Sequence, residues 1–200
     1  MNTPYQLPAL PYGLSDLEPA YSAELLELHH SKHHNAYVKG ANSTLEKLAE
    51  ARANSAFEHI NGLQKNLAFH ISGHVLHSLF WQSMDPDGGG TPPDALRAQI
   101  ENDFGSVDAL RAQIEAAATA LQGSGWVCLS WDGLAGHLVV EQIYDHQSNA
   151  AHGAQSILAL DMWEHAYYLQ YRNVKASWIK AYWQLANWVG AQERFERLKS

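Results

Sequence analysis

The segment from Met84 to Asp94, MDPDGGGTPPD, constrains the fold of this chain more than any other stretch. It holds three glycines and three prolines. Because proline lacks a backbone N–H and its ring clashes with the preceding helical turn, a helix cannot run through this segment. A chain of 200 residues is long enough for one or two small domains. We therefore expect two domains, residues 1–90 and residues 91–200.

The first half of the chain is predicted to be helical. Residues 1–20 are punctuated by prolines and are expected to be extended. Leucines at helical spacing then indicate one or two helices from about Ser22 to about Arg52. A second long helix is expected from about Ile60 to Ser83.

The second half combines strands with helices. WVCLSW (Trp126–Trp131), HLVVEQIY (His137–Tyr144) and SILAL (Ser156–Leu160) have the composition of strands, and a glycine-bearing turn joins the first two. The region from Ser177 to Arg197 returns to a helical pattern with one aromatic face. The expected fold class is α+β, with a small antiparallel sheet in the C-terminal half.

Charge and composition exclude several classes of protein. The formal net charge is −8, whereas a nucleic-acid-binding protein would carry a basic stripe or domain, so we expect no nucleic-acid partner. Nowhere do 18 apolar residues run together, so no membrane span is expected. Cys128 is the single cysteine, which rules out an intramolecular disulfide and suits a reducing compartment. Since the N-terminus also lacks the pattern of a signal peptide, we expect a cytoplasmic protein.

Four histidines fall between Leu28 and Val38, in LHHSKHHNAYV. On an α-helix, His29, His33 and Tyr37 share one face, because residues four apart stack above one another. His30 and His34 form another stripe about 100° around the helix. We expect only the first stripe to point at a functional site, and the second to face the surface or a partner.

Further candidates for metal ligands lie in two distant segments. FHISGHVLHSLFW (Phe69–Trp81) places His77 beside an aromatic wall, and LDMWEH (Leu160–His165) presents Asp161 and His165 directly after an apolar strand. A buried carboxylate is costly unless it is paired or bound to a metal. With one ligand from each N-terminal helix, the set would be three imidazoles and one carboxylate, which suits iron, manganese or zinc.

Four separated motifs resemble the iron/manganese superoxide dismutase family, and the similarity extends over essentially the whole chain. They are LHHSKHHNAYVKGAN, GHVLHSLFW, GSGW (Gly123–Trp126) and LDMWEHAYYLQY (Leu160–Tyr171). The resemblance implies a long α-hairpin domain, then an α/β domain around a three-stranded antiparallel sheet. It also implies disproportionation of superoxide to dioxygen and hydrogen peroxide, by a single metal ion cycling between the +3 and +2 states.

Carried over position by position, the resemblance assigns roles to residues in each motif. The implied metal ligands are His29, His77, Asp161 and His165. Tyr37 and His33 are implied to form the gate and proton route at the mouth of the site. The implied aromatic shell consists of Trp81, Trp126 and Trp163, and the implied subunit contacts are Glu164 with His165 of the other subunit, and Tyr168 with His33.

The residue that donates a hydrogen bond beside the metal departs from the commonest family patterns. Gly73 stands where iron-type members usually have glutamine, so we expect the donor to come from YDHQSN. By alignment it is His146, as in actinobacterial members, although a slip of one residue would make it Gln147. Such a donor tunes the reduction potential of a metal. The expected cofactor is one iron or manganese ion per subunit; of the two, we expect iron.

The substrate would be an anion approaching an acidic protein. We expect Lys32, together with Arg172 or Lys175, to make the mouth of the site locally positive. The expected assembly is a homodimer, or a homotetramer.

Two other classes of protein fit parts of the pattern. A di-iron carboxylate bundle requires two Glu-x-x-His motifs, and only Glu27–His30 supplies one. A metal-storage or helical interaction protein could use the histidines without catalysis. Neither class explains the order of the four motifs along the chain.

Overall fold

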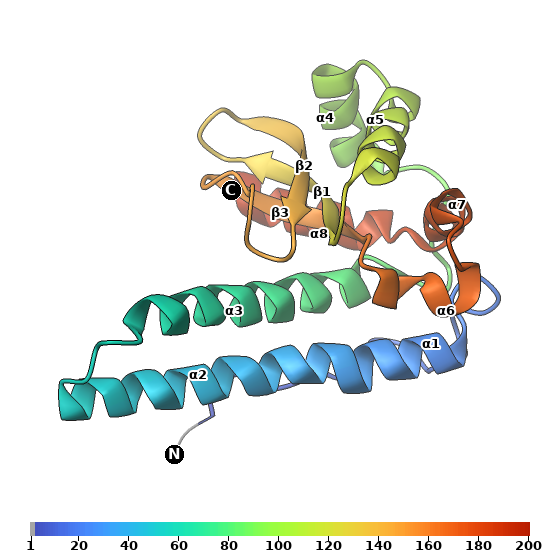
Figure 1. The fold of residues 1–200 in the computed structure, drawn as a ribbon. Helices are drawn as coiled ribbons and strands as arrows, with labels where there is room; N and C mark the ends of the chain where they lie inside the picture. Colours follow the sequence, from blue (N-terminus) through green and yellow to red (C-terminus); the bar gives the residue numbers. More distant parts are fainter. Residues whose placement is uncertain (1–2) are drawn as a thin grey trace.

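Two antiparallel helical arms form the N-terminal half of the structure, a computed structural model that describes residues 3–200. Helix α1 (Ala23–Leu28) continues through a π-helical turn (His29–His34) into α2 (Asn35–Asn54). Helix α3 (Ile60–Gln82) then returns alongside α2, as Figure 1 shows. The helices expected in this half are therefore confirmed, and they form a long hairpin.

The two arms approach closely where a glycine on each faces a ring on the other. A Cβ atom on Gly73 of α3 would lie 2.7 Å from Cδ1 of Tyr37 on α2, and one on Gly40 of α2 would overlap the ring of His70 on α3. A Cβ atom cannot come so near another heavy atom without a shift. Gly73 faces a buried ring and therefore sets the spacing of the hairpin at this level, whereas Gly40 faces the outer end of a half-buried ring.

The C-terminal half contains a three-stranded sheet with helices packed around it (Figure 1). Strands β1 (Gly125–Asp132), β2 (His137–Tyr144) and β3 (Ala154–Asp161) are antiparallel in the order β2-β1-β3. The other elements are α4 (Asp94–Phe104), α5 (Val107–Ala120), a 3₁₀ turn (Glu164–Ala166), α6 (Tyr168–Tyr171), α7 (Lys175–Leu185) and α8 (Trp188–Lys199).

This architecture confirms the expected α+β class, with a helical hairpin domain and a three-stranded antiparallel sheet. Among the residues from 3 to 200, no helix is both long enough and apolar enough to cross a membrane.

Side chains from three helices occupy the outer edge of β3. The backbone N–H of Ala159 donates to Oγ of Ser83 at the end of α3 (3.1 Å), and its carbonyl accepts from the hydroxyl of Tyr182 on α7 (2.9 Å). Nε of Arg194 on α8 donates to the carbonyl of Ile157 (2.7 Å). Because buried backbone groups must find partners, these contacts take the place of a fourth strand. They also fix the end of α3 against β3.

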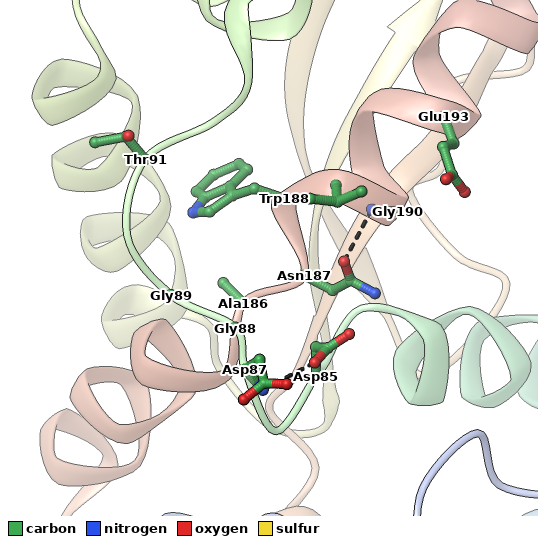
Figure 2. Close-up of a pocket in the computed structure, with 11 residues that line it drawn as sticks. Asp85, Asp87, Gly88, Gly89, Thr91, Ala186, Asn187, Trp188, Gly190 and Glu193 are labelled. Carbon is green, nitrogen blue, oxygen red and sulfur yellow. Dashed lines mark hydrogen bonds between the residues drawn. The ribbon is translucent and has the colours of Figure 1, made fainter.

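The region from Ser177 to Arg197 is helical as expected, but it consists of two helices, because α7 and α8 are separated at Ala186 and Asn187. The break lets this segment pair with the interdomain linker, through the N–H of Asp85 to the carbonyl of Leu185 (2.8 Å) and further bonds nearby. Asn187 caps α8 by accepting from the N–H of Gly190 at 2.8 Å, as Figure 2 shows. A hollow at this junction contains none of the histidines singled out in the sequence.

Candidate metal centre

Four side chains from distant parts of the chain meet at one point between the two halves. His29 lies on the π-helical turn, His77 on α3, Asp161 at the end of β3, and His165 in the following 3₁₀ turn. Each offers one ligand atom, and these atoms all lie within 4.8 Å of one another. Measured from Oδ2 of Asp161, the Nε2 atoms are 3.2 Å (His29), 3.3 Å (His165) and 3.9 Å (His77) away.

The π-helical turn explains how two histidines five residues apart can both face inward. In an α-helix, His29 and His34 would lie roughly 140° apart around the axis. The wider π-helical turn, with its i→i+5 hydrogen bonds, brings them toward the same side, and both are fully buried. The expectation that His34 faces the surface or a partner is therefore wrong. Burial, followed by the neighbouring His74 and His30, lowers the pKa of His34 to about 3.

Hydrogen bonds orient two of the imidazoles toward the common centre. Nδ1 of His77 donates to the carbonyl of Gly73 at 2.6 Å, so the Nε2 atom of the neutral ring has a free lone pair. Nδ1 of His29 lies 2.7 Å from the hydroxyl of Tyr21. Nε2 is buried in both rings and has no hydrogen-bond partner among the described residues. A metal ion at the centre would satisfy these atoms, which is the arrangement typical of ligating histidines.

Burial also keeps these imidazoles in the form that binds metals. Desolvation lowers the pKa of both His29 and His77 well below the ordinary value, and the other histidines of the cluster lower it further. A metal ligand must be the neutral imidazole. The two rings therefore need not lose a proton before they bind a cation near neutral pH.

Asp161 is the strongest indication of a cation. Its side chain is fully buried. Oδ1 accepts the backbone N–H of Trp163 at 2.8 Å, whereas Oδ2 faces the three histidines. Within residues 3–200, no lysine or arginine forms an ion pair with it. Because a buried carboxylate is costly without a compensating charge, the three imidazoles and this carboxylate fit one divalent or trivalent metal ion.

Three tryptophans surround the ligands. The ring of Trp81 is 4.8 Å from that of His29, and the ring of Trp126 is 5.0 Å from that of His77, both nearly perpendicular. Trp163 stacks on His165 with centroids 5.2 Å apart. Trp81 and Trp126 are fully buried, so they exclude water from one side of the cluster.

His146, rather than Gln147, is buried beside the centre. Its ring is buried, while Gln147 is exposed and accepts the backbone N–H of His146 at 3.3 Å. Nδ1 of His146 accepts the indole N–H of Trp126 at 3.0 Å, so the neutral ring carries its proton on Nε2, which has no partner in the described chain. Burial lowers the pKa of His146 to about 3. The ring is therefore a neutral donor.

Tyr37 and His33 lie on the outer side of the cluster. The ring of Tyr37 is 5.0 Å from that of His77 and 4.5 Å from that of His146, and its side chain is mostly buried. Burial, assisted by the nearby carboxylates, raises the pKa of Tyr37. His33 is exposed and stacks on His165 at 4.5 Å, and burial on that side lowers its pKa. The structure thus brings both residues to the side of the centre nearest solvent.

Comparison with known proteins agrees with this geometry. Residues 4–85 match the alpha-hairpin domain of the iron/manganese superoxide dismutases, and residues 92–194 match their C-terminal domain. The chain is similar to "Superoxide dismutase [Mn/Fe]" of Propionibacterium freudenreichii subsp. shermanii, with 52% identity over 98% of both chains. It is 51% identical to "Superoxide dismutase [Mn]" of Mycolicibacterium smegmatis and 50% identical to "Superoxide dismutase [Fe]" of Mycobacterium tuberculosis, in each case over 96% of this chain and 92% of the relative.

This chain belongs to the iron/manganese superoxide dismutase family. Its two matched segments and nearly full-length similarity leave no substantial part of the protein outside that family. The activity of this dismutase is accordingly the disproportionation of superoxide to dioxygen and hydrogen peroxide.

The remaining residues named from the sequence lie at the surface of the dismutase chain. Lys32 and Glu164 are exposed, and Tyr168 is 46% exposed. Arg172 and Lys175 were the other cations expected at the mouth of the site. Arg172 is exposed, whereas Nζ of Lys175 donates to the carbonyl of Leu121 at 3.0 Å.

Sequence reasoning missed two residues that touch the centre. Tyr21 precedes His29 by eight residues, but at that distance no spacing rule connects the two. His34 was placed on the wrong face because the pattern was interpreted with α-helical spacing throughout. A cluster of four histidines on one predicted helix is a possible signal of a π-helical turn, since such turns are frequent at functional sites.

We expect the substitution Gly73→Ala to lower both stability and activity. The added methyl group would lie 2.7–2.8 Å from Cδ1 and Cγ of Tyr37, a buried ring that cannot swing away. Overpacking of this kind costs about 1–3 kcal/mol, more than the roughly 1 kcal/mol by which alanine favours a helix over glycine. Urea denaturation at fixed protein concentration and a dismutation assay measure the two effects.

Gly40→Ala is the matched control on the opposite helix. Its methyl group meets the outer end of the half-buried His70 ring, which can rotate toward solvent. The denaturation midpoint of this variant should stay near that of the parent protein. Equal midpoints and full activity in both variants would show that the hairpin is not constrained at Gly73.

Proposed function

We propose that His29, His77, Asp161 and His165 bind one iron or manganese ion per subunit, and that this ion is the redox centre of the dismutase. The buried carboxylate of Asp161, which faces three imidazole nitrogens and no basic residue within the described chain, carries the proposal. An iron or manganese ion held there would exchange one electron with each superoxide as it cycles between the +3 and +2 states.

The side chains around the ligands exclude water and supply hydrogen bonds. The ring of His146 lies 4.5 Å from that of Tyr37 and 5.7 Å from that of His77, and its buried, unpaired Nε2–H is available to donate to an oxygen atom of water or substrate. Its ring is held between the indole N–H of Trp126 and the face of Trp163, which stacks on it at 4.4 Å. The donor is therefore preorganised and needs no rearrangement during turnover.

Two protons must reach each peroxide that leaves. Because its pKa is raised, the hydroxyl of Tyr37 remains protonated at neutral pH and can donate to peroxide. His33 stands nearer to solvent with a lowered pKa, so its neutral ring can accept a proton from water and pass it inward. We assign these two residues to the gate and the proton route.

Iron is the proposed native metal. We propose that groups outside the four ligands determine the preference for iron or manganese. Three relatives of nearly equal similarity, at 50–52% identity, are named for Mn/Fe, Mn and Fe. Nitrogen and carboxylate ligands suit both metals. Selection would then rest on outer groups such as His146, with Gly73 leaving room for the Tyr37 ring.

Removal of one ligand tests the metal site. His77→Ala should lose the bound metal and reduce dismutation by at least about 100-fold, since loss of a ligand costs more than the 10–100-fold typical of an outer-shell partner. Elemental analysis of protein from its own host and assays after reconstitution with each metal separately give the readouts. Activity only with manganese would overturn the assignment of iron.

His152→Ala is the control for this experiment, because His152 is an exposed histidine on the loop between β2 and β3. It should retain one metal per chain and full activity. A His77→Ala protein that kept both would exclude the four-residue site.

Lys32 is proposed to attract superoxide toward the mouth. It is exposed on the π-helical turn that also carries His29 and His33. The chain as a whole has a net charge of −8, so a local positive charge would be needed to concentrate an anion. Lys175 is less available for this role because its ammonium group is bound to the carbonyl of Leu121.

Charge reversal tests this steering. Lys32→Glu should lower kcat/KM several-fold at low ionic strength, and the difference from the parent enzyme should shrink as salt screens the field. Lys47→Glu makes the same change of charge on the far part of α2 and should have little effect. Equal rate constants for the two variants at low salt would remove Lys32 from the mechanism.

The proposed assembly is a homodimer or a homotetramer, with Glu164 and Tyr168 at the subunit contact. Inside the described chain, the hydrogen bond of His165 runs from Nε2 to Asp161 at 3.3 Å, which leaves Nδ1 available. Glu164, beside it, is exposed and could reach Nδ1 of a partner's His165 across a two-fold axis. The partner would thereby orient a ligand.

Glu164→Ala should weaken this dimer by at least about 10-fold in Kd, the equivalent of about 1.4 kcal/mol, and should also accelerate metal loss. Sedimentation over a range of concentrations measures the shift toward the 22.2 kDa chain. Glu50→Ala, an exposed residue on α2, is the control. A parent enzyme that sediments as a monomer would refute the proposed contact between Glu164 and His165 of the partner subunit.

The proposal also includes a domain division at residue 90 and a cytoplasmic location. The boundary is supported by the two matched segments, 4–85 and 92–194, which flank it. A reducing compartment suits the single cysteine: Cys128 is buried in β1, and burial raises the pKa of its thiol to about 12. Cell fractionation would test the location.

A further inference from the structure

A hydrogen-bonded pair of histidines, His34 and His74, lies beside the metal centre. The indole Nε1–H of Trp81 donates to Nδ1 of His34 at 2.9 Å, and Nε2 of His34 lies 2.8 Å from Nδ1 of His74. Trp81 and His34 are fully buried, whereas His74 is half-buried. The pair therefore connects the wall of the centre with the outer side of the hairpin.

These contacts permit only one tautomer of His34. An indole nitrogen can only donate, so Nδ1 of His34 must accept with its lone pair. A proton on Nδ1 would place two N–H groups against each other in a buried site. The single proton of the ring must therefore lie on Nε2, from which it donates to Nδ1 of His74. Trp81 thus sets the tautomer of His34, and His74 supplies the acceptor that holds the ring with Nδ1 toward Trp81.

His34 contacts two residues that form the centre. Its ring stacks on that of His77, with centroids 5.3 Å apart and planes 22° apart. Through its hydrogen bond it also fixes the indole of Trp81, whose ring is 4.8 Å from that of His29. One buried ring is therefore in contact with one proposed ligand directly and with another through Trp81.

The N-terminal segment covers the outer end of this pair. The ring of Tyr5 packs edge-on against His74 at 5.6 Å, and the backbone of Tyr5 forms two hydrogen bonds with the side chain of Asn42 on α2. His30 lies nearby, but its Nε2 bonds to the carbonyl of Pro8 at 2.8 Å and not to Trp81. The ring of His30 is nevertheless 5.8 Å from that of Trp81.

We propose that His34 is a positioning residue: anchored through Nε2 by His74, it accepts from Trp81, holds that indole against His29 and keeps the ring of His77 in place. His34 touches neither substrate nor metal, and it acts through the two side chains that it orients. The inference rests on the proposed metal site only for the consequence at the metal. The tautomer and the position of Trp81 are properties of the chain itself.

A comparison of two outer histidines separates hydrogen bonding from packing. His74→Leu removes the acceptor that anchors Nε2 of His34, without any hydrogen bond to Trp81 being altered directly. His30→Leu removes a ring that packs beside Trp81 but takes no part in the pair. Hydrogen exchange of the Trp81 indole N–H in the ¹⁵N-labelled, metal-free full-length chain is the readout, with its signal assigned by its loss in Trp81→Phe.

Two variants of His34 complete the series. In His34→Asn the side-chain oxygen lies near the position of Nδ1 and can still accept from Trp81, whereas His34→Leu provides no acceptor. Urea midpoints identify any variant that fails to fold. Should His34→Leu fail, the comparison of His74→Leu with His30→Leu decides the matter.

We expect indole exchange to be at least about 10-fold faster in His74→Leu and His34→Leu, and within about threefold of the parent in His30→Leu and His34→Asn. Release of metal from the holoenzyme to a chelator should follow the same order, at roughly the 10-fold lower limit for loss of an outer partner of a ligand. Unchanged exchange in His74→Leu, or equal acceleration in His30→Leu, would overturn the proposal. Changed exchange with unchanged metal release would instead count against the metal site.

Discussion

The structure depends on the cost of burying one carboxylate. Asp161 ends a strand of the C-terminal domain, and the groups that face its Oδ2 come from the helical hairpin as well as from the turn that follows. Uncharged imidazole rings cannot offset a buried negative charge by themselves. The centre between the two halves therefore needs a bound cation to compensate the charge of the Asp161 carboxylate. Fold and cofactor are thus coupled, as is usual for buried metal sites.

A few residues of the hairpin depart from regular helix packing, and they place its side chains around Asp161. The π-helical turn directs both His29 and His34 inward, and two turns further along, Gly40 and Gly73 allow the arms to approach until each receives a ring from the other. Gly73 also accepts the Nδ1 proton of His77 through its carbonyl. A larger residue there would disturb Tyr37 and, through the backbone, the orientation of a ligand.

Much of this could be predicted from the sequence. The linker MDPDGGGTPPD, the leucine spacing and the three apolar runs correctly indicated a helical half followed by a half with a sheet. The positions of His29, His77, Asp161 and His165 were indicated by motifs that the family resemblance tied together, and the structure brings these four side chains into one cluster.

What could not be predicted depends on contacts between distant segments or on local departures from ideal helices. The inward position of His34 follows from a π-helical turn, which α-helical spacing does not describe. The break between α7 and α8 exists because Leu185 and Ala186 pair with a linker about one hundred residues away. Tyr21 reaches His29 only after α1 has formed and the extended N-terminal segment has folded back. No periodicity in the sequence encodes such contacts.

Two tryptophan–histidine pairs on different sides of the centre obey the same chemical rule. Trp126 donates to Nδ1 of His146, and Trp81 donates to Nδ1 of His34. Because an indole can only donate, each tryptophan forces the proton of its histidine onto Nε2. In His146 that proton has no partner within the described chain, whereas in His34 it is donated to His74. The same pairing therefore produces a hydrogen-bond donor beside the metal site in one case and a fixed wall in the other. Relatives named for iron, manganese or both share about half of this sequence, so differences in how such pairs are placed could alter metal preference while the four ligands stay the same.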